Sequence, residues 1–316
     1  VVLRSSRDGA AHWDPAKQLD GGTGADVARN VSIAGGPGEQ AVAVWERTSG
    51  TTTEVRASVT RQAGLDWSPS VPVDQRTGAR QDQTPRVSVG SSGVAYAAWL
   101  DGTTVWLARS GDGGSTWSAP VSANRGGDAI AGPSLAAGVQ PAGDGAPARE
   151  WAHLAWNARA PGGPRRIAYA GLRWSATDGW IFRNPDEVRV DTPPRPDLDA
   201  WQPIVAADDA AHVFVAYVGA RPTWKLFVLV LLNVSRDAGG TWLDQELRTV
   251  ATPACGSPAL AIDTEVAFSD PALQARYDRW IHELRCVQCQ NAAIADSPVG
   301  LASDLRRQVR EMIAAG

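Results

Sequence analysis

The sequence has no long apolar run and no long basic run, and each absence excludes a class of protein. The longest apolar stretch, Leu226 to Leu232, is far shorter than the roughly 20 residues that a membrane helix needs. A pI near 5.6, a net charge of −4 and only two lysines argue against a nucleic-acid partner. Because 43% of the residues are apolar and 20% are charged, disorder and a collagen-like fibre are also excluded.

Methionine and tryptophan are unevenly distributed along the chain. Fourteen tryptophans accompany one methionine, 32 glycines and 21 prolines, a composition that favours short strands joined by tight turns. Every tryptophan except Trp280 lies before residue 243, and the only methionine is Met312. We therefore expect two unlike domains, one rich in strands and a smaller one at the C-terminal end.

A repeated turn motif organises the first 250 residues. Two copies, at residues 110–117 and 235–242, read S-x-D-x-G-x-x-W, while copies at 6–13, 60–67 and 175–180 are degraded. A second series, opened by Pro85, Pro133, Pro203 and Pro258, runs in phase with the first and precedes alternating apolar stretches. Each unit is predicted to hold two or three strands and a hairpin carrying the motif. The motif residues are Ser6, Asp8, Trp13, Ser110, Asp112, Gly114, Trp117, Ser235, Asp237, Gly239 and Trp242.

These units resemble the Asp-box (BNR) repeats of sialidase-like β-propellers, and the likeness covers about residues 1 to 263. The likeness implies a mainly β propeller, and propellers of this kind usually resemble six-bladed rings. About four complete units can be counted here, and a half unit at the start could pair with another at 258–263 as a closing blade, which gives about five blades and suggests a truncated ring. The physics of the motif is structural, because the Asp and Ser side chains can cap backbone N–H groups, Gly permits positive φ, and Trp packs under the turn. Asp8, Asp112 and Asp237 are accordingly expected to hold hairpins and not to act in catalysis.

The resemblance to sialidases does not extend to their chemistry. Their arginine triad, Tyr-Glu nucleophile pair and N-terminal Arg-Ile-Pro segment cannot be located in the sequence, and no pair of acidic residues indicates a glycosidase. The expected role of the propeller is to bind a glycan or a protein through its loops. An exo-sialidase is the weaker alternative.

The last fifty residues change from a period of two to a period of 3.6. Ser269 or Asp270 is predicted to cap a helix that has Pro271 in its first turn. A second helix is predicted to begin at Asp296 or Ser297 and to end at Gly316. The apolar faces of the two helices are predicted to carry Leu273, Tyr277, Trp280, Ile281 and Leu284 in the first, and Leu301, Leu305, Val309, Met312 and Ile313 in the second.

This stretch resembles the N-terminal domain of the cytochrome c-type biogenesis protein CcmH (CcmH/CycL/NrfF) family. The likeness spans about 55 residues and gives a second domain over 264–316. It implies part of a three-helix thiol–disulfide domain of the bacterial periplasm, membrane-associated where an anchor follows, with apocytochrome c and the heme-ligation machinery as partners and heme as a transient ligand or substrate. The matching residues are Ile262-Asp263-Thr264, Phe268, Asp270-Pro271-Ala272-Leu273, Arg276-Tyr277, Leu284-Arg285-Cys286-x-x-Cys289-Gln290-Asn291, Ile294-Ala295-Asp296-Ser297, Leu301-Ala302-x-Asp304-Leu305-Arg306 and Val309-Arg310-Glu311-Met312-Ile313.

The chemistry of the C-x-x-C pair agrees with this resemblance. Cys286 and Cys289 can close a short disulfide, and Arg285 beside them lowers the pKa expected for a thiol. Gln290 stands where the histidine of a C-x-x-C-H heme-attachment motif would be, so covalent heme is not expected on this chain. Two alternatives remain open: a structural disulfide, or a zinc site that would draw on Cys255 and His282.

The junction between the two domains has two readings. Residues 257–261 read as the opening strand of a propeller unit, and Ala259-x-Ala261 followed by Ile262 also resembles a signal-peptidase site before the mature start of a CcmH-like protein. The strand reading is preferred, because a polar turn separates the apolar run at 226–232 from that point. Either reading suggests that two gene products are joined here.

Overall fold

The computed structural model describes residues 1–6, 8, 10–19, 26–77, 80–124, 128–143, 145–159, 162–184, 187–191, 199–220, 228–242, 250–252, 270–284, 309–310 and 312–313. The chain divides into two units, Val1–Pro258 and Ala259–Gly316, and each is described by itself. The domain boundary predicted between residues 263 and 264 falls outside the described residues and stays a prediction.

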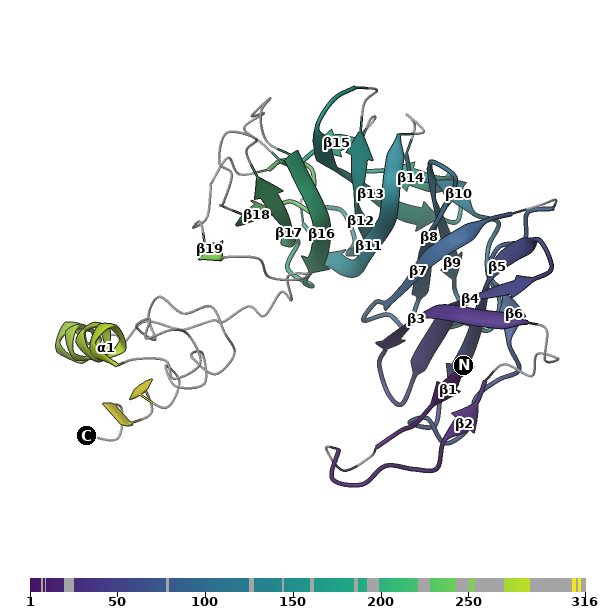
Figure 1. Cartoon of the computed structure of the whole chain (residues 1–316), viewed down its shortest axis with the longest axis horizontal. Helices are drawn as coiled ribbons and strands as arrows, with labels where there is room; N and C mark the ends of the chain where they lie inside the picture. Colours follow the sequence, from purple (N-terminus) through teal and green to yellow (C-terminus); the bar gives the residue numbers. More distant parts are fainter. Residues whose placement is uncertain are drawn as a thin grey trace. The chain divides into compact units, whose positions relative to one another are not determined.

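The first unit is built from four successive antiparallel sheets, which we call blades 1 to 4 (Figure 1). In each blade, strands adjacent in sequence are also adjacent in the sheet, as the alternating apolar pattern and short turns of the repeats predict. Blade 3 has one extra strand, β15, which pairs with β13. The strands are, in blade 1, β3 (Val27–Gly35), β4 (Ala41–Ser49), β5 (Thr52–Thr60) and β6 (Val71–Pro72); in blade 2, β7 (Asp82–Val89), β8 (Ala95–Asp101), β9 (Thr104–Ser110) and β10 (Val121–Ser122); in blade 3, β11 (Ala129–Gln140), β12 (Arg149–Arg159), β13 (Arg165–Ser175), β14 (Gly179–Phe182) and β15 (Val188–Arg189); in blade 4, β16 (Asp199–Ala207), β17 (Val213–Ala220), β18 (Val228–Ser235) and β19 (Val250–Thr252).

A two-stranded sheet precedes blade 1. It pairs β1 (Val2–Leu3) with β2 (Lys17–Gln18), and the repeat turn at residues 6–13 lies between them. In the four blades the corresponding turn joins the third strand to the fourth, so β1 and β2 hold the third and fourth positions of a partial blade. The mainly β class is confirmed, with four blades and this partial one; the half unit predicted at 258–263 lies outside the described residues.

The core of the first unit lies between neighbouring blades. One apolar cluster joins each pair of consecutive blades. Each blade places a large aromatic residue in the middle or second half of its second strand, and this side chain is buried in all four: Trp45, Trp99, Trp156 and Tyr217. Burial of such side chains is the main favourable contribution to folding in a sheet protein of this kind.

The second unit contains helix α1 (Pro271–Glu283). Asp270 caps it as predicted, since its side-chain Oδ1 accepts a hydrogen bond from the Ala272 N–H at 2.8 Å. Of the apolar face, Tyr277 and Ile281 are buried, whereas Trp280 and Leu284 are exposed. Residues 309–310 and 312–313 are helical, with Val309 and Ile313 buried and Met312 exposed, so the predicted apolar faces are only partly buried. No helix among the described residues is long and apolar enough to cross a bilayer.

Candidate functional site

The turn at Asp112 shows what the repeat motif does. The Asp112 Oδ1 atom accepts hydrogen bonds from Ser110 Oγ at 2.7 Å, from the Ser115 N–H at 3.1 Å and from the Thr116 N–H at 2.9 Å. The Ser110 hydroxyl in turn accepts the Gly114 N–H at 2.6 Å. Partial burial acts to raise the pKa of Asp112, but the hydrogen bonds from Thr116 and Ser110 outweigh it and lower the pKa to about 2. This carboxylate is therefore ionised and fully engaged within its own turn.

The turns at Asp237 and Asp8 repeat these contacts. Asp237 Oδ1 accepts from Ser235 Oγ at 2.8 Å and from the Thr241 N–H at 2.8 Å. Asp8 Oδ1 accepts from Ser6 Oγ and from the His12 N–H, each at 2.9 Å. Such contacts suit the predicted capping role and leave little acceptor capacity for a substrate.

Glycine is needed in the motif for two reasons: the turn has a positive φ at this position, and the neighbouring blade leaves no room for a Cβ. Gly114 and Gly239 have positive φ values of 106° and 83°. A Cβ on Gly114 would lie 3.0 Å from Val42 of blade 1, and a Cβ on Gly239 would lie 1.9 Å from the Tyr169 hydroxyl of blade 3. Each of these turns thus packs directly against the preceding blade.

The tryptophans of the motif differ in burial. Trp117 is buried in the cluster between blades 1 and 2, and Trp242 makes an edge contact with Tyr169 at 4.7 Å between ring centroids. Trp13 is 54% exposed, so the expectation that it packs under its turn is wrong. The reason lies in the partial blade, where β1 and β2 are only two residues long and offer little sheet for Trp13 to cover.

The opposite end of the blades carries a second series of carboxylates, which the sequence analysis missed. An aspartate at or just before the first residue of the first strand pairs with an arginine in every blade. Asp26 meets Arg47 at 2.6 Å in blade 1, and Asp82 meets Arg76 at 3.0 Å in blade 2. In blade 3 Asp128 pairs with Arg166, and in blade 4 Asp199 is held by Arg165 of blade 3 at 2.6 Å. The sequence separations of these pairs vary, so no repeat indicates them.

Asp82 is the most perturbed of these carboxylates. It is buried, and it shares the Arg76 guanidinium with Asp74 and Asp101. Trp99 Nε1 donates to Asp82 Oδ1 at 3.1 Å, while Asp82 Oδ2 has no hydrogen-bond partner among the described residues. Burial, followed by repulsion from the Asp74 carboxylate, raises the pKa of Asp82 to about 8. A carboxylic acid with a shifted pKa can belong to a functional site or to a structural ion-pair network. Asp82 belongs to a structural network.

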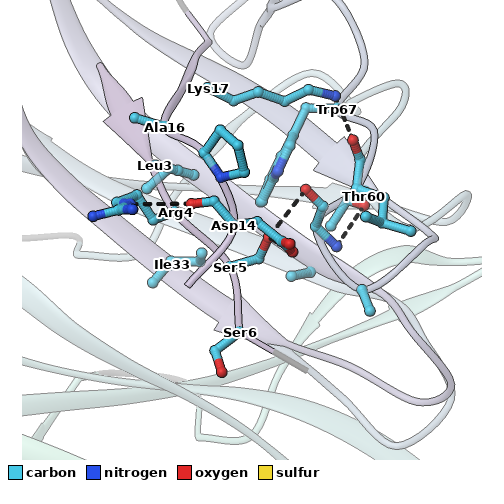
Figure 2. Close-up of a pocket in the computed structure, with 15 residues that line it drawn as sticks. Leu3, Arg4, Ser5, Ser6, Asp14, Ala16, Lys17, Ile33, Thr60 and Trp67 are labelled. Carbon is cyan, nitrogen blue, oxygen red and sulfur yellow. Dashed lines mark hydrogen bonds between the residues drawn. The ribbon is translucent and has the colours of Figure 1, made fainter. Parts of the chain in front are cut away.

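A cavity of about 420 Å³ lies between the partial blade and blade 1. Figure 2 shows the residues that line it. Its walls are mainly apolar, with Leu3, Ile33 and Trp67 among them. Ile33 is 54% exposed, although Val87 and Val205 hold the same position in blades 2 and 4 and are 7% and 5% exposed. Polar side chains also line it, but Arg4, Ser5 and Lys17 are hydrogen-bonded to neighbouring parts of the chain. We therefore interpret this cavity as an incompletely filled junction between sheets.

One tyrosine–glutamate contact occurs between two blades, at residues that the sequence analysis did not pair. The Tyr96 hydroxyl donates to Glu150 Oε1 at 3.1 Å across blades 2 and 3. Tyr96 is only 2% exposed, and burial, together with the Glu150 charge, raises the pKa of its hydroxyl. A nucleophile must reach its substrate and lose its proton readily, so this pair does not supply the missing sialidase chemistry.

The predicted redox pair lies elsewhere in the chain. Cys286 and Cys289, with Arg285 and Gln290, are outside the described residues, as is Cys255. His282 is exposed on α1, where its Nδ1 donates to the Asp278 carbonyl oxygen at 2.7 Å. Within the described part of the chain, no three His, Cys, Asp or Glu side chains are grouped as a metal ion would require.

Residues 249–316 match the family described as CcmH, cytochrome C biogenesis protein. The CcmH protein of Bradyrhizobium diazoefficiens is 48% identical over 68 residues, which are 21% of this chain and 42% of that protein. The Pseudomonas aeruginosa CcmH protein is 42% identical over 62 residues, covering 20% and 39%, and the Ccl2 protein of Rhodobacter capsulatus is 40% identical over 60 residues, covering 19% and 40%. The chain thus spans about two fifths of these relatives, and the CcmH resemblance is confirmed for its C-terminal segment.

Several solved structures align with part of the chain. A protein of unknown function from Dyadobacter fermentans aligns with a TM-score of 0.46 at 14% identity, over 70% of this chain and 69% of that one. The intramolecular trans-sialidase of Ruminococcus gnavus gives 0.45 at 18% identity, over 68% and 45%, and an arabinanase of Penicillium chrysogenum gives 0.43 at 15%, over 68% and 66%.

Proposed function

We propose that the C-terminal segment exchanges disulfides with the C-x-x-C-H motif of an apocytochrome c, in preparation for heme attachment. The observation that supports this most strongly is the 48% identity to a cytochrome c-type biogenesis protein over 68 residues. Cys286 and Cys289 form the redox pair in this proposal, and Arg285 stabilises a thiolate beside them. Gln290 replaces the histidine that covalent heme attachment would need, so heme belongs to the substrate side of the reaction.

The proposed exchange runs in two steps. The Cys286 thiolate attacks one sulfur of the apocytochrome disulfide, and the other sulfur leaves as a thiolate. Cys289 then attacks the mixed disulfide, which frees the apocytochrome dithiol and leaves a disulfide between Cys286 and Cys289. Two electrons pass from this chain to the apocytochrome, which is then ready for heme. The setting that we propose is the periplasm, with the heme-ligation machinery as partner and membrane association where an anchor follows.

Redox titration of the full chain tests this proposal. The protein is equilibrated in defined glutathione mixtures, alkylated, and digested for mass spectrometry, with Cys255→Ser as a control that keeps the proposed pair. We expect a reversible Cys286–Cys289 disulfide in both proteins, and a mixed disulfide between a Cys289→Ser variant and a C-x-x-C-H peptide. The proposal fails if Cys286 and Cys289 remain alkylatable in oxidising buffer, or if Cys286 pairs with Cys255.

A second function, binding of a glycan or protein by the β unit, is supported by a different observation. The motif carboxylates are engaged in their own turns, while a polar cavity opens between blades 2 and 3. Release of sialic acid from a fluorogenic substrate, lost on substitution of a cavity arginine but kept on substitution of Asp112 or Asp237, would instead support the exo-sialidase alternative.

A further inference from the structure

A cavity of about 500 Å³ lies between blades 2 and 3, at the end of the blades that carries the Asp-box turns. We call this the box end. Volumes of 300 to 1,000 Å³ are typical of small-molecule sites. The cavity is formed by the start of β8, the end of β9, the start of β12 and the end of β13. Its polar and aromatic lining residues are Tyr96, Arg109, Arg149, Glu150, Arg173 and Trp174.

The one carboxylate among these side chains is already engaged. Glu150 Oε2 accepts from Ser92 Oγ at 2.7 Å, and Oε1 accepts from the Tyr96 hydroxyl. The carboxylate lies so close to Gly90 that a Cβ there would be 2.1 Å from Glu150 Oε2. Glu150 therefore fastens blade 3 to blade 2, and much of its acceptor capacity is used inside the protein.

Two of the arginines that line the cavity, unlike Glu150, are not paired within the described part of the chain. Arg149 and Arg173 form no ion pair with any residue that the structure describes, and the Arg173 Nε is buried without a hydrogen-bond partner there. The guanidinium group of Arg173 lies 5.6 Å from the Trp151 ring centroid. Arg109 lies against the Tyr96 hydroxyl and lowers its pKa in opposition to burial. Three guanidinium groups thus line a cavity whose described carboxylate is already hydrogen-bonded, an arrangement suited to an anion.

An aromatic ring stands beside these charges. Trp174 is 41% exposed and lines the cavity, and an edge contact with Trp180 at 5.5 Å and 79° supports its ring. An exposed indole gives a flat apolar face that accepts the C–H face of a sugar ring, while its position is fixed by packing.

We propose that this cavity binds an anionic saccharide, whose carboxylate or sulfate group contacts Arg149 and Arg173 and whose sugar ring lies against Trp174. This deepens the second function proposed above, because it gives the β unit a ligand class and a site. The site is at the box end, away from the Asp–Arg pairs of the opposite end. Arg149 and Arg173 bind the anionic group, and Trp174 selects for a sugar over a simple anion.

Calorimetric titration of the full chain with three disaccharides tests the proposal. Digalacturonic acid carries carboxylates, a heparin-derived disaccharide carries sulfates, and maltose is neutral. We expect at least one anionic disaccharide to bind at least tenfold more tightly than maltose, and Arg149→Gln, Arg173→Gln and Trp174→Ala each to weaken it about tenfold. Arg29→Gln removes an exposed charge on β3 and should leave binding unchanged, and circular dichroism confirms that each variant is folded.

The possible results distinguish failure of this proposed binding site from failure of the two functions proposed above. Equal binding of maltose and the anionic disaccharides, or an equal loss in Arg29→Gln, overturns the cavity as the anion site. Saccharide binding that Arg149→Gln and Arg173→Gln leave unchanged overturns the site while leaving the binding function of the β unit in place. Absence of binding by all three disaccharides also overturns it, and the thiol titration above then still decides the redox function independently.

Discussion

The two ends of the blades use the same residue, aspartate, in two different ways. At the box end, Asp112 and Asp237 accept hydrogen bonds from groups two to four residues away in their own turns. At the opposite end, the separations between paired aspartates and arginines vary from 6 residues, for Asp82 and Arg76, to 38, for Asp128 and Arg166. Contacts within a turn fix the spacing of the residues that make them, whereas contacts between strands do not. The first kind is therefore visible as a sequence motif, and the second becomes visible only in the folded protein.

Substitution of the motif glycine should have the largest effect, because it disturbs both the turn and the contact between blades. We expect Gly239→Ala to lower the free energy of unfolding by roughly 2–4 kcal/mol, the sum of a left-handed backbone and an overpacked contact with Tyr169. Gly102→Ala is a matched control, since Gly102 also has a positive φ, 62°, but nothing lies within 4 Å of its would-be Cβ. Urea denaturation of both variants measures the difference, and equal losses would contradict a role for the blade contact.

Removal of a motif carboxylate should cost less. We expect Asp112→Ala and Asp237→Ala each to destabilise the protein by roughly 1–2 kcal/mol, as lost caps do, with no change in ligand affinity of the folded fraction. Asp66→Ala removes an exposed carboxylate that pairs with Lys17, and it should change the free energy of unfolding by no more than about 0.5 kcal/mol. A variant that kept its melting temperature but lost ligand binding would show that the carboxylate acts in binding.

The low pKa of Asp112 allows the prediction for Asp112→Ala to be tested as a function of pH. Its folded pKa, about 2, lies below the usual 3.8, so its contribution is present above pH 3.8 and is lost as the pH falls through 2. The difference in stability between the protein and Asp112→Ala should therefore shrink from pH 4 to pH 2. A difference that stays constant over this range would argue that the effect of the substitution is not carried by the charge.

At the opposite end, Asp82 should show the reverse dependence. Its folded pKa, about 8, lies above 3.8, so the folded state holds a proton that the unfolded state has lost, and stability falls as the pH rises from about 4 to about 8. Asp82→Asn cannot titrate, and we expect its stability relative to the unsubstituted protein to improve across this window. Asp74→Asn is the comparison: the Arg76 hydrogen bonds hold the pKa of Asp74 below its usual value against burial, so this variant should be destabilised. It also removes the Asp74 charge that helps to raise the Asp82 pKa, so its pH dependence should lie between those of Asp82→Asn and the unsubstituted protein. Parallel urea-denaturation curves for Asp82→Asn and the unsubstituted protein from pH 5 to pH 9 would refute the raised pKa.

The sequence predicts the repeated part of this molecule well, for a physical reason. Strand alternation, the buried aromatic position that includes Trp45 and Trp99, and the cap at Asp270 all depend on residues close together in the chain. The Tyr96–Glu150 contact and the arginine cavity depend on how one blade meets the next, and their residues lie up to 82 positions apart, from Ser92 to Trp174 at the limits of the lining. Exposure of Trp280 and Met312 was missed because helical periodicity shows which residues share a face, and not what covers that face.

The smallest effect is expected in the degraded first copy of the motif, where alanine stands in place of glycine. Ala10 keeps the left-handed backbone of the motif, with φ of 71°, and its N–H still donates to Ser6 Oγ at 2.9 Å. Ala10 is exposed, so the cost of its backbone is not accompanied by a close contact such as that of Gly239 with Tyr169. Ala10→Gly relieves strain of roughly 1–2 kcal/mol but adds conformational freedom to the unfolded chain, which leaves a net gain in the free energy of unfolding of about 0.5–1 kcal/mol.

Urea denaturation measures this gain, with Ala238→Gly as a buried comparison that also has a positive φ, 56°. A loss of stability in Ala10→Gly would mean that this turn is held by contacts of its alanine methyl group, and that the glycine of the other copies serves the contact between blades alone.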